Sequence, residues 1–511
     1  ADPNGLLFLQ NAIDWALADT DLVELADIVL PASGWSEKDG TVTNSERRIS
    51  RQRGLLPPPG EARHDWWILC RVAERLGFGE AFAYDHPSEI FDEHARLSGL
   101  DNQGRRAFDI SGLAGLSRVE YDDLAPIQWP VTASAPRGTA RLFESGRFYT
   151  ESGRARLWPV SARAPRQATD ADYPLRLNSG RGRDQWHTMT RTARASRLMN
   201  HRSEPFVEVH RDDAEALGLC DQGLARVRSR SGEMRARVRV SAAQRRGEVF
   251  VPIHWTPRFS HSPLAGSLFA AEVDPLSGQP ETKHGAVAIA PLEHAWEATL
   301  VVSRALAQQG PPEGASLVAR VVEGTNYWTR VPLASAERWQ LAGEPVEQGR
   351  DENGGVERDW LDWAARQLPG ELGPVVQDPA SGRWRLAGFE QGRLCWWLMV
   401  GPVSELPGLG WLCERFDEAV RGEAMGQQHR RRVLAACHDG AADQGPIVCS
   451  CHQVGRTPIQ RAIRAGDDSV EALGARLACG TQCGSCIPEL KSLVEEEKSR
   501  GRIERTQPLS V

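Results

Sequence analysis

The cysteines near the end of the chain constrain its fold more than any other feature. Four of them form two close pairs, Cys449-Ser450-Cys451 and Cys483-Gly484-Ser485-Cys486, separated by thirty-one residues. The spare cysteine Cys479 lies just before the second pair, and five others are scattered: Cys70, Cys220, Cys395, Cys413 and Cys437. This uneven distribution does not suit a disulfide framework. Two close pairs can instead supply four thiolates to one metal centre in a reducing compartment.

Short helices are expected between and after the cysteine pairs. Thr457–Gln460 has the residue order of a capping box with Pro at the first helical position, and Asp468 or Ser469 can cap a second helix that ends near Leu477. A third helix is predicted over residues 487–500. Free backbone N–H groups at such helix starts can hydrogen-bond sulfur ligands and offset thiolate charge.

The residues themselves leave three interpretations of these cysteines open. Free buried thiols are the least suited to two loop-borne pairs. Structural zinc accepts four cysteines at similar spacings, and an iron–sulfur cluster also prefers an all-thiolate site.

The tail from Ile447 to residue 498 resembles the bacterioferritin-associated-ferredoxin-like [2Fe-2S] domains. Their pattern is C-x-C, about thirty residues, then C-x2-C, and this chain also has the Gln482–Cys486 turn. The resemblance favours [2Fe-2S] over zinc. It implies that the ligands are Cys449, Cys451, Cys483 and Cys486, and it leaves Cys479 outside the cluster.

Length and charge exclude several classes of protein. A chain of 511 residues predicts about three to four domains at roughly 150 residues each. The net charge of −7 gives no overall basic bias for nucleic acid, and apolar runs such as Leu394–Val400 are too short to cross a membrane. We therefore expect neither nucleic-acid nor membrane partners. Because the chain begins Ala1-Asp2-Pro3 without an initiator Met or an export signal, we interpret it as a portion of a longer protein.

Residues 1–125 predict an α/β domain. The apolar run Ala26–Leu30 is typical of a buried strand, and the polar loop Pro31–Arg48 would then lie at the carboxyl end of a parallel sheet, where ligands bind. The residues alone favour a solvated surface loop over a ligand site. Residues 126–172 are rich in Pro, Ala and Arg and are interpreted as a connection, with a hairpin over residues 141–157.

Residues 173–292 predict a β-barrel or a β-sandwich. Short β-like segments punctuated by glycines are expected at Pro205–Val209, Leu224–Ser229, Met234–Val240 and Glu248–Ile253. Residues 293–440 have mixed α/β patterning with many Trp and Glu and no recognisable chemistry. Residues 441–446 form a short polar linker before the tail.

The start of the predicted barrel carries a strong local positive charge. Residues 173–202 hold seven arginines and one acidic residue, and the core of this segment is Leu177–Arg181 followed by Gln185–Arg191. Glycine lets the backbone approach a ligand, and the hydroxyl, indole and imidazole groups are donors suited to a polyphosphate-bearing heterocycle. RNA is a weaker match, because only one aromatic residue lies among the arginines, and a basic surface loop stays open.

Three segments together resemble the molybdopterin-dinucleotide oxidoreductases. Ala26–Pro31 with Glu37–Arg48 is similar to that family's ADxVLP…EK(D/E)GTxxNxERR segment, Asn178–Thr190 to its N-x-GR…WHTxT turn, and Asp274–Lys283 to its DPxSxQPExK segment. Within the family the closest likeness is to assimilatory nitrate reductases, some of which append a C-terminal [2Fe-2S] domain. Besides the tail, the shared motifs are spread over residues 20–290.

The resemblance implies a set of residues that contact a molybdopterin dinucleotide. The set comprises Asn44, Asn178, Ser179, Gly180, Arg181, Trp186, His187, Thr188, Thr190 and Lys283. Its serine, glycine and arginine would meet the pterin or its pyrophosphate, its Trp-His-Thr run would pack on and hydrogen-bond the pterin side, and its lysine would reach a cofactor oxygen. Asn44 would lie near the nucleotide. One departure concerns residues 265–268, which lack the Asn of the family's A-N-x-L turn.

The fold that the resemblance implies is a multidomain α/β protein with a β-barrel. The expected parts are the C-terminal part of a molybdopterin oxidoreductase α/β domain over 1–125, the connection over 126–172, a double-psi-like dinucleotide-binding barrel over 173–292, a mixed α/β region over 293–440 and a small helical [2Fe-2S] domain over 447–500.

The implied activity is that of a cytoplasmic, molybdenum-dependent assimilatory nitrate reductase, with nitrate as the small-molecule substrate. Its cofactors would be molybdenum-bis(molybdopterin guanine dinucleotide) and the [2Fe-2S] cluster, reduced by a donor such as a flavoprotein subunit, a ferredoxin or a flavodoxin. The family's [4Fe-4S] cysteines and molybdenum ligand would lie upstream, so no catalytic residue is assigned here and we expect these residues alone to be inactive. Two alternatives stay open: another family member such as a formate dehydrogenase, and a non-catalytic iron–sulfur redox module.

Overall fold

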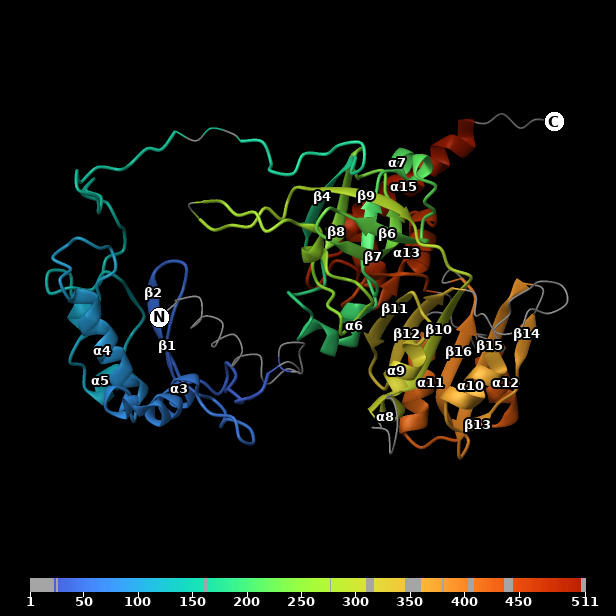
Figure 1. Ribbon diagram of the computed structural model, residues 1–511, viewed down its shortest axis with the longest axis horizontal. Helices are drawn as coiled ribbons and strands as arrows, with labels where there is room; N and C mark the ends of the chain where they lie inside the picture. The colour runs from blue at the N-terminus through green and yellow to red at the C-terminus, as the bar shows by residue number, and fades with distance from the viewer. Residues whose placement is uncertain are drawn as a thin grey trace. The chain divides into compact units, whose positions relative to one another are not determined.

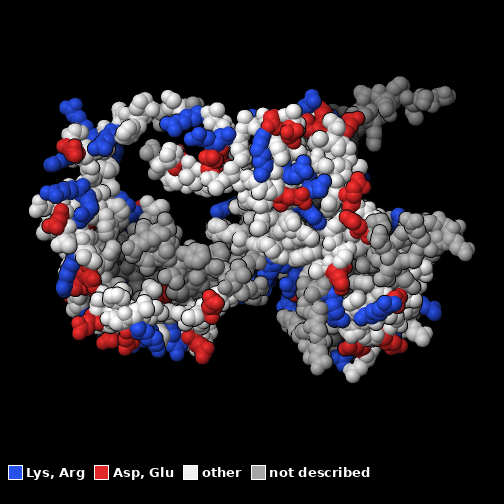
Figure 2. All heavy atoms as spheres, in the orientation of Figure 1, with Lys and Arg blue, Asp and Glu red and all other residues white. Residues whose placement is uncertain are grey.

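The computed structural model describes residues 23, 26–159, 161, 163–275, 277–308, 317–344, 360–378, 381–402, 409–435 and 444–506. The chain divides into two compact units, Ala1–Arg163 and Ala164–Val511, and each is considered by itself (Figure 1). On the face shown in Figure 2, acidic and basic side chains are interspersed over the described parts. None of the helices described has both the length and the apolar character that a membrane crossing requires.

The first unit combines a small antiparallel sheet with short helices. Strands β1 (Gly40–Thr43), β2 (Arg48–Gln52) and β3 (Ile127–Gln128) pair in that order, and β1 and β2 form a hairpin. The helices are α3 (Asp65–Ala73), α4 (Pro87–Gly99) and α5 (Arg118–Asp122), with single helical turns at Glu74–Phe78, Gly79–Phe82 and Ser111–Leu113. The core of this unit is formed where Phe91 of α4 packs with Ile110, Tyr121 and Val131.

Two predictions for this unit are wrong. Residues 26–30 form no strand, and Ile28 is 78% exposed. A buried parallel strand needs sheet neighbours, and the described residues of this unit provide only the antiparallel β1-β2-β3 sheet, whose first strand lies inside the predicted polar loop. Residues 141–157 form successive turns, with a hydrogen bond from Phe148 N to Gly153 O (2.9 Å), because they lack the apolar alternation that a strand pair buries.

The second unit begins with a closed barrel of six strands, ordered β4-β8-β5-β7-β6-β9. The strands are β4 (Leu175–Gly180), β5 (Phe206–Val209), β6 (Leu224–Arg228), β7 (Glu233–Val240), β8 (Glu248–Pro252) and β9 (Gly285–Pro291). Alternate residues, such as Leu175 and Leu177 on β4, point into an apolar interior. The predicted barrel is confirmed. Its connections carry α6 (Ser196–Met199), α7 (Arg211–Ala216) and helical turns at Thr192–Arg194 and Ala265–Leu268.

A seven-stranded sheet follows the barrel. Its strands are β10 (Trp296–Ser303), β11 (Tyr327–Pro332), β12 (Ala336–Gly343), β13 (Glu371–Leu372), β14 (Val376–Asp378), β15 (Arg383–Glu390) and β16 (Arg393–Val400). Its helices are α8 (Arg304–Gln308), α9 (Leu317–Val322), α10 (Trp360–Gln367), α11 (Leu409–Val420) and α12 (Gln427–Ala435). Because strand side chains alternate, α8, α9 and α10 pack on one face and α11 and α12 on the other.

The second face of this sheet also supports the barrel domain. Met189 and Met199, from the segment after β4, and Trp255, from the segment after β8, are buried in one cluster with Trp397 of β16 and Val331 of β11. The mixed α/β region, for which the sequence indicates no chemistry, therefore forms the packed support behind the turn that follows β4.

The cysteine pairs lie in a small domain at the end of the second unit. It contains β17 (Ile447–Cys449), β18 (Val454–Gly455), α13 (Arg456–Arg464), α14 (Val470–Leu477) and α15 (Ile487–Thr506). The three predicted helices are present, and the Ser469 hydroxyl accepts the backbone N–H of Ala472 at 3.1 Å as the cap of α14. Helix α13 begins at Arg456 with no side-chain cap, so the capping-box interpretation of residues 457–460 is wrong.

Candidate functional site

The turn after β4 is shaped by a buried histidine. Because β4 and β8 are parallel, their carboxyl ends meet, with Gly180 opposite Pro252. His254, just beyond β8, accepts the backbone N–H of Gly182 at Nε2 (2.6 Å), and its Nδ1 lies 2.7 Å from the carbonyl oxygen of His187. Nδ1 must then carry the proton. Burial lowers the pKa of His254, which keeps this ring neutral.

The barrel brings two of the predicted cofactor residues together. Ser179 Oγ donates to the carbonyl oxygen of Thr282 at 2.6 Å, and Lys283 Nζ donates to the carbonyl oxygen of Ser179. An added Cβ on Gly180 would lie 2.7 Å from the Phe250 ring, so a side chain at this position would force the ring or the backbone to move. The end of β4 and residues 282–283 therefore lie side by side at one edge of the barrel.

An exposed aromatic and cationic surface follows on the same turn. The Arg181 guanidinium lies 4.7 Å from the ring centroid of Trp186, which is 49% exposed, and the Trp186 and His187 rings meet edge to face at 4.4 Å. Thr188 and Thr190 are half-buried beside them. A guanidinium on an exposed indole can bind an anionic group next to a planar heterocycle.

Two other predicted residues, Asn178 and Asn44, have different surroundings. Asn178 is exposed on β4, where strand alternation turns its side chain away from the face of Ser179. Asn44 belongs to the first unit, and its Oδ1 accepts the backbone N–H groups of Glu46 (2.9 Å) and Arg48 (3.0 Å). In this chain Asn44 therefore shapes the β1–β2 hairpin.

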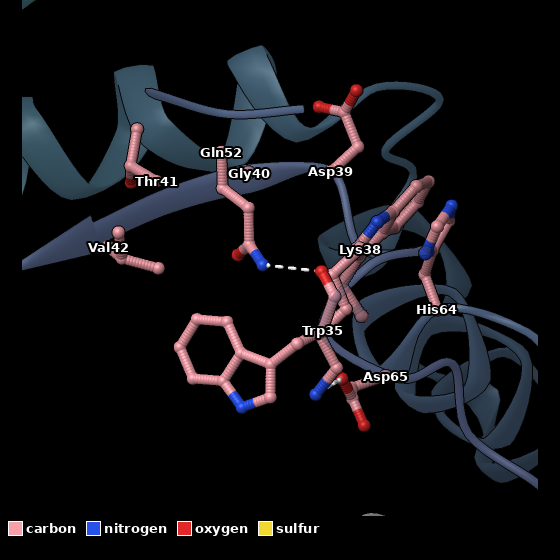
Figure 3. Close-up of a pocket in the computed structure, with 10 residues that line it drawn as sticks. Trp35, Lys38, Asp39, Gly40, Thr41, Val42, Gln52, His64 and Asp65 are labelled. Atoms are coloured by element: carbon pink, nitrogen blue, oxygen red, sulfur yellow. Dashed lines mark hydrogen bonds and ion pairs between the residues drawn. The ribbon is translucent and has the colours of Figure 1, made fainter. Parts of the chain in front are cut away.

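The first unit has a cavity of about 290 Å³ at the start of β1 (Figure 3). Its lining comprises Trp35, Lys38, Asp39, Gly40, Thr41, Val42, Gln52, His64, Asp65 and Trp66. Lys38 and Asp65 form an ion pair (2.8 Å), and Gln52 Nε2 donates to the carbonyl oxygen of Trp35 (2.9 Å). The cavity thus uses the predicted motif loop together with His64–Trp66 at the start of α3, which sequence reasoning missed.

The five clustered cysteines lie in two sets. Cys451 and Cys483, the outer pair, have their Sγ atoms 3.2 Å apart. Cys449, Cys479 and Cys486, the inner set, are buried together in the core of the domain. The Ser485 hydroxyl lies 3.3 Å from Cys483 Sγ, and its side-chain and backbone hydrogen bonds lower the pKa of that thiol. Among the described residues, no group of three or more His, Cys, Asp or Glu side chains is placed so that it could hold a metal ion. Binding of one metal centre therefore requires the outer pair and the inner set to move closer together.

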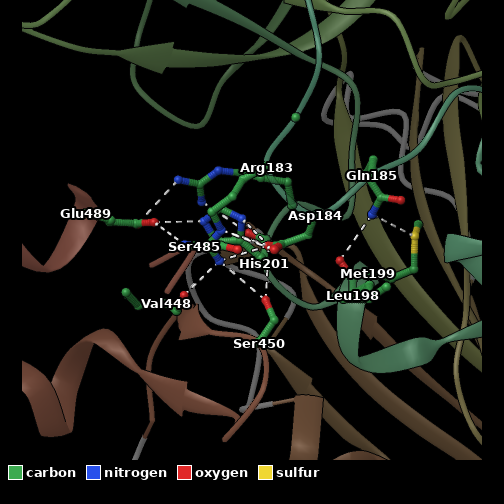
Figure 4. A network of polar contacts seen from close by, with 12 residues as sticks. Arg183, Asp184, Gln185, Leu198, Met199, His201, Val448, Ser450, Ser485 and Glu489 are labelled. Carbon is green, nitrogen blue, oxygen red and sulfur yellow. Dashed lines mark hydrogen bonds and ion pairs between the residues drawn. The ribbon is translucent and has the colours of Figure 1, made fainter. Parts of the chain in front are cut away.

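A polar network joins the turn after β4 to the cysteine loops (Figure 4). Arg183 donates to the carbonyl oxygen of Val448 (2.8 Å) and to Glu489 (3.1 Å). His201 lies between Asp184 (2.9 Å) and Glu489 (3.0 Å). Sequence reasoning missed this network, since it spans segments about 300 residues apart in the chain and no local pattern marks it.

The carboxylates of this network are held in their charged form. Burial by itself would raise the pKa of Asp184, but hydrogen bonds from His201 and Arg183 hold that pKa well below its usual range. The pKa of Glu489 is lowered in the same way, with the His201 hydrogen bond opposing the effect of burial. At neutral pH both carboxylates are therefore charged, Asp184 in the barrel domain and Glu489 in the cysteine domain.

Three segments of the chain match known protein families. Residues 16–75 match the family "Molybdopterin oxidoreductase", residues 175–286 the "Molydopterin dinucleotide binding domain" and residues 447–496 the "BFD-like [2Fe-2S] binding domain". A nitrate reductase of Klebsiella oxytoca is 45% identical over 486 residues, which cover 94% of this chain and 51% of that protein. The chain is a homologue of the molybdopterin oxidoreductases. Both predicted resemblances are confirmed.

Two other relatives align with a smaller part of the chain. The assimilatory nitrate reductase catalytic subunit of Bacillus subtilis is 33% identical over 285 residues, covering 55% of this chain and 38% of that protein. The F420-dependent formate dehydrogenase subunit alpha of Methanocaldococcus jannaschii is 37% identical over 236 residues, covering 46% and 33%. The chain spans about half the length of the nitrate reductase that it matches over most of its residues.

Proposed function

We propose that this chain supplies the dinucleotide-binding region and an electron-entry centre of a molybdenum-dependent assimilatory nitrate reductase. The extent of the likeness carries the proposal. The Klebsiella nitrate reductase aligns with 94% of the chain, so that alignment reaches into both the barrel and the cysteine domain, whereas the formate dehydrogenase aligns with 46%. Nitrate is accordingly the proposed substrate, the cytoplasm the proposed location, and a flavoprotein subunit, ferredoxin or flavodoxin the proposed donor.

The donor set of the cysteine domain fits a [2Fe-2S] cluster. Cys449 ends β17 and Cys451 lies in the turn that follows it, and Cys483 and Cys486 come from the loop that leads into α15. Two loops that each present two thiols provide the four thiolates that such a cluster needs. When bound, the cluster supplies one-electron transfer, while the protein supplies ligands, hydrogen bonds and charge. We assign the cluster to these four cysteines and leave Cys479 outside it.

The edge of the barrel fits a phosphate-bearing cofactor. Arg181 and Trp186 offer a cation on an exposed ring, and Lys283 adds a second cation beside Ser179. We assign the pyrophosphate and pterin contacts to this edge, with His187, Thr188 and Thr190 along the same turn. The parallel pairing of β4 with β8 and of β5 with β7 supports a double-psi-like barrel. Asn44 and Asn178 are the least supported members of the proposed set.

Two other functions compete with nitrate reduction. The formate dehydrogenase relative suggests formate oxidation, and the cysteine domain by itself would suit a non-catalytic redox module. Nitrite formation with reduced methyl viologen and formate oxidation with oxidised methyl viologen, measured in parallel on the natural gene product, separate the three. We expect nitrite formation without formate oxidation. Formate oxidation alone would contradict the nitrate assignment, and an iron–sulfur protein active in neither assay would be a redox module. Residues 1–511 alone are expected to form no nitrite, because the resemblance assigns none of them as the molybdenum ligand.

A further inference from the structure

One side chain of the barrel domain reaches both cysteine-bearing loops. Arg183 Nη2 donates to the carbonyl oxygen of Val448 at 2.8 Å and lies 3.3 Å from the hydroxyl of Ser450, so it contacts the residues on both sides of Cys449. Its Nη1 donates at 3.1 Å to Glu489, in the first turn of α15 and so just after Cys486. A single guanidinium therefore links the two segments that carry the inner cysteines.

Neighbouring residues make the same connection. Ser450 Oγ donates to Asp184 at 3.0 Å, which attaches the cysteine loop to the residue after Arg183 (Figure 4). Asn200 Nδ2 donates to the side-chain oxygen of Gln453 at 2.7 Å, and Gln453 Nε2 donates to the carbonyl oxygen of Arg197 at 3.3 Å. The contacts come from both ends of the segment 181–202, so they fix the orientation of the cysteine domain as well as its position.

The residue that makes these contacts lies inside the proposed dinucleotide turn. Arg181, two residues earlier, carries the contact with Trp186, and the backbone N–H of Gly182 between them is held by His254. The side chain of Arg183 is 19% exposed, and its carboxylate partners Asp184 and Glu489 are 9% and 32% exposed. Charge-assisted hydrogen bonds in such a partly dry environment are stronger and more selective in geometry than those at an open surface.

We propose that Arg183 is a positioning residue that fixes the cluster-bearing loops against the dinucleotide turn and raises the reduction potential of the cluster. The proposal rests on the proposed [2Fe-2S] site. The guanidinium places a fixed positive charge within hydrogen-bond distance of the residues on both sides of Cys449, whose thiolate becomes part of a more negative cluster on reduction, and it withdraws electron density from that loop. Both effects stabilise the reduced form. The same contacts hold the cluster at a fixed distance from the dinucleotide turn.

The test compares three variants of the iron-loaded chain. Arg183→Gln removes the charge and the bidentate fork, whereas Arg183→Lys keeps the charge and loses the fork. Arg176→Gln is the matched control, because Arg176 is an exposed arginine of the same barrel that pairs with Glu248 at 2.8 Å. The readouts are the midpoint potential of the cluster, from a redox titration followed by electron paramagnetic resonance, and hydrogen exchange of the backbone amides in residues 448–455.

We expect Arg183→Gln to lower the midpoint potential and to speed exchange by about tenfold, the factor that matches the loss of one charge-assisted hydrogen bond. Arg183→Lys should keep most of the potential and still speed exchange, and Arg176→Gln should change neither. Unchanged potential and exchange in Arg183→Gln would overturn the proposal. If Arg183→Gln loses its cluster, the test rests on Arg183→Lys. Backbone exchange in Arg183→Lys at the wild-type rate would then overturn the proposal. A wild-type chain that binds zinc contradicts the proposed function, and the exchange experiment then still tests the docking.

Discussion

His254 accepts the backbone N–H of Gly182 on its Nε2 atom at 2.6 Å, which makes a neutral imidazole a structural requirement of the turn after β4. The ring is fully buried, and its other nitrogen is engaged with the carbonyl oxygen of His187. Both His187 and Met189 have left-handed backbone angles, with φ of 42° and 63°. A side chain from the end of β8 thus holds an unusual backbone path at the end of β4.

Acid is expected to release this turn. Burial lowers the pKa of His254, so the unfolded form takes up a proton at a higher pH than the folded form. The stability that His254 contributes is therefore present above about pH 6.5 and is lost as the pH falls through its folded pKa. Hydrogen exchange of the Gly182 amide, corrected for its intrinsic pH dependence, should become faster between pH 7 and pH 5.

His254→Gln provides the control for this prediction. An amide side chain can accept one hydrogen bond and donate another but does not titrate in this range. The corrected exchange rate at Gly182 should then be independent of pH. An equal acceleration on acidification in wild type and variant would show that another group controls the turn.

A side chain at Gly180 is expected to destabilise the barrel, because an added Cβ would lie 2.7 Å from the Phe250 ring. Gly180→Ala should lower the free energy of unfolding by about 1–3 kcal/mol, the usual range for overpacking in a tight core. Urea unfolding followed by tryptophan fluorescence measures the change. The double variant with Phe250→Leu should recover part of the loss. Gly182→Ala should cost less, since its Cβ would meet His254 at an ordinary 3.6 Å, and an equal loss in both single variants would contradict the steric explanation.

The barrel and the sheet that follows it are joined by a buried ionic cluster. Arg237 of β7 contacts Glu204 at 2.8 Å and Glu297 of β10 at 3.1 Å, and the Tyr327 hydroxyl of β11 donates to Glu204 at 3.0 Å. Arg237→Met should destabilise the second unit by about 3–5 kcal/mol, because it leaves the buried carboxylate of Glu204 without its cation and leaves Glu297 with only His294, 3.2 Å away. Arg226→Met breaks only an exposed pair with Glu233 and should cost less than about 1 kcal/mol. Similar losses in the two variants, measured by urea unfolding, would contradict the role of burial.

How much the sequence could predict differs between the two units. The barrel could be predicted because short segments such as 234–240 alternate and are closed by glycines, and the tail could be predicted because the cysteine spacing is distinctive. The strand at 26–30 was predicted incorrectly, since an apolar run is buried only when other strands cover it, and its residues are exposed. The hydrophobic pattern shows only that a segment is able to form a buried strand, and whether it does so depends on the segments that pack against it.

The residues around the candidate site were only partly predictable. The motif at 178–190 could be located because its glycine, arginine and aromatic residues are adjacent in sequence. His254 could have been found from the rule that parallel strands end together, once β4 and β8 were known to be neighbours. Arg183 with Glu489 could not, because that contact joins two domains and depends on how they pack.

Cys479 tests which thiols bind metal. It is buried beside Cys449 and Cys486, so proximity alone does not distinguish it from a ligand. We expect Cys479→Ser to keep the full iron content and visible absorption of the wild-type chain, whereas Cys486→Ser should lose most of both, because a cluster needs all four thiolates. Loss of iron in Cys479→Ser with retention in Cys486→Ser would contradict the assignment and would make Cys479, and not Cys486, the fourth ligand.

The composition of the metal centre tests the central claim most directly. Iron, acid-labile sulfide and zinc are measured on the chain purified without oxygen, together with the electron paramagnetic resonance spectrum before and after reduction by dithionite. The account predicts iron and sulfide in equal amounts, one [2Fe-2S] cluster per chain, and a signal that appears on reduction. A colourless chain with stoichiometric zinc and no signal after reduction would contradict it.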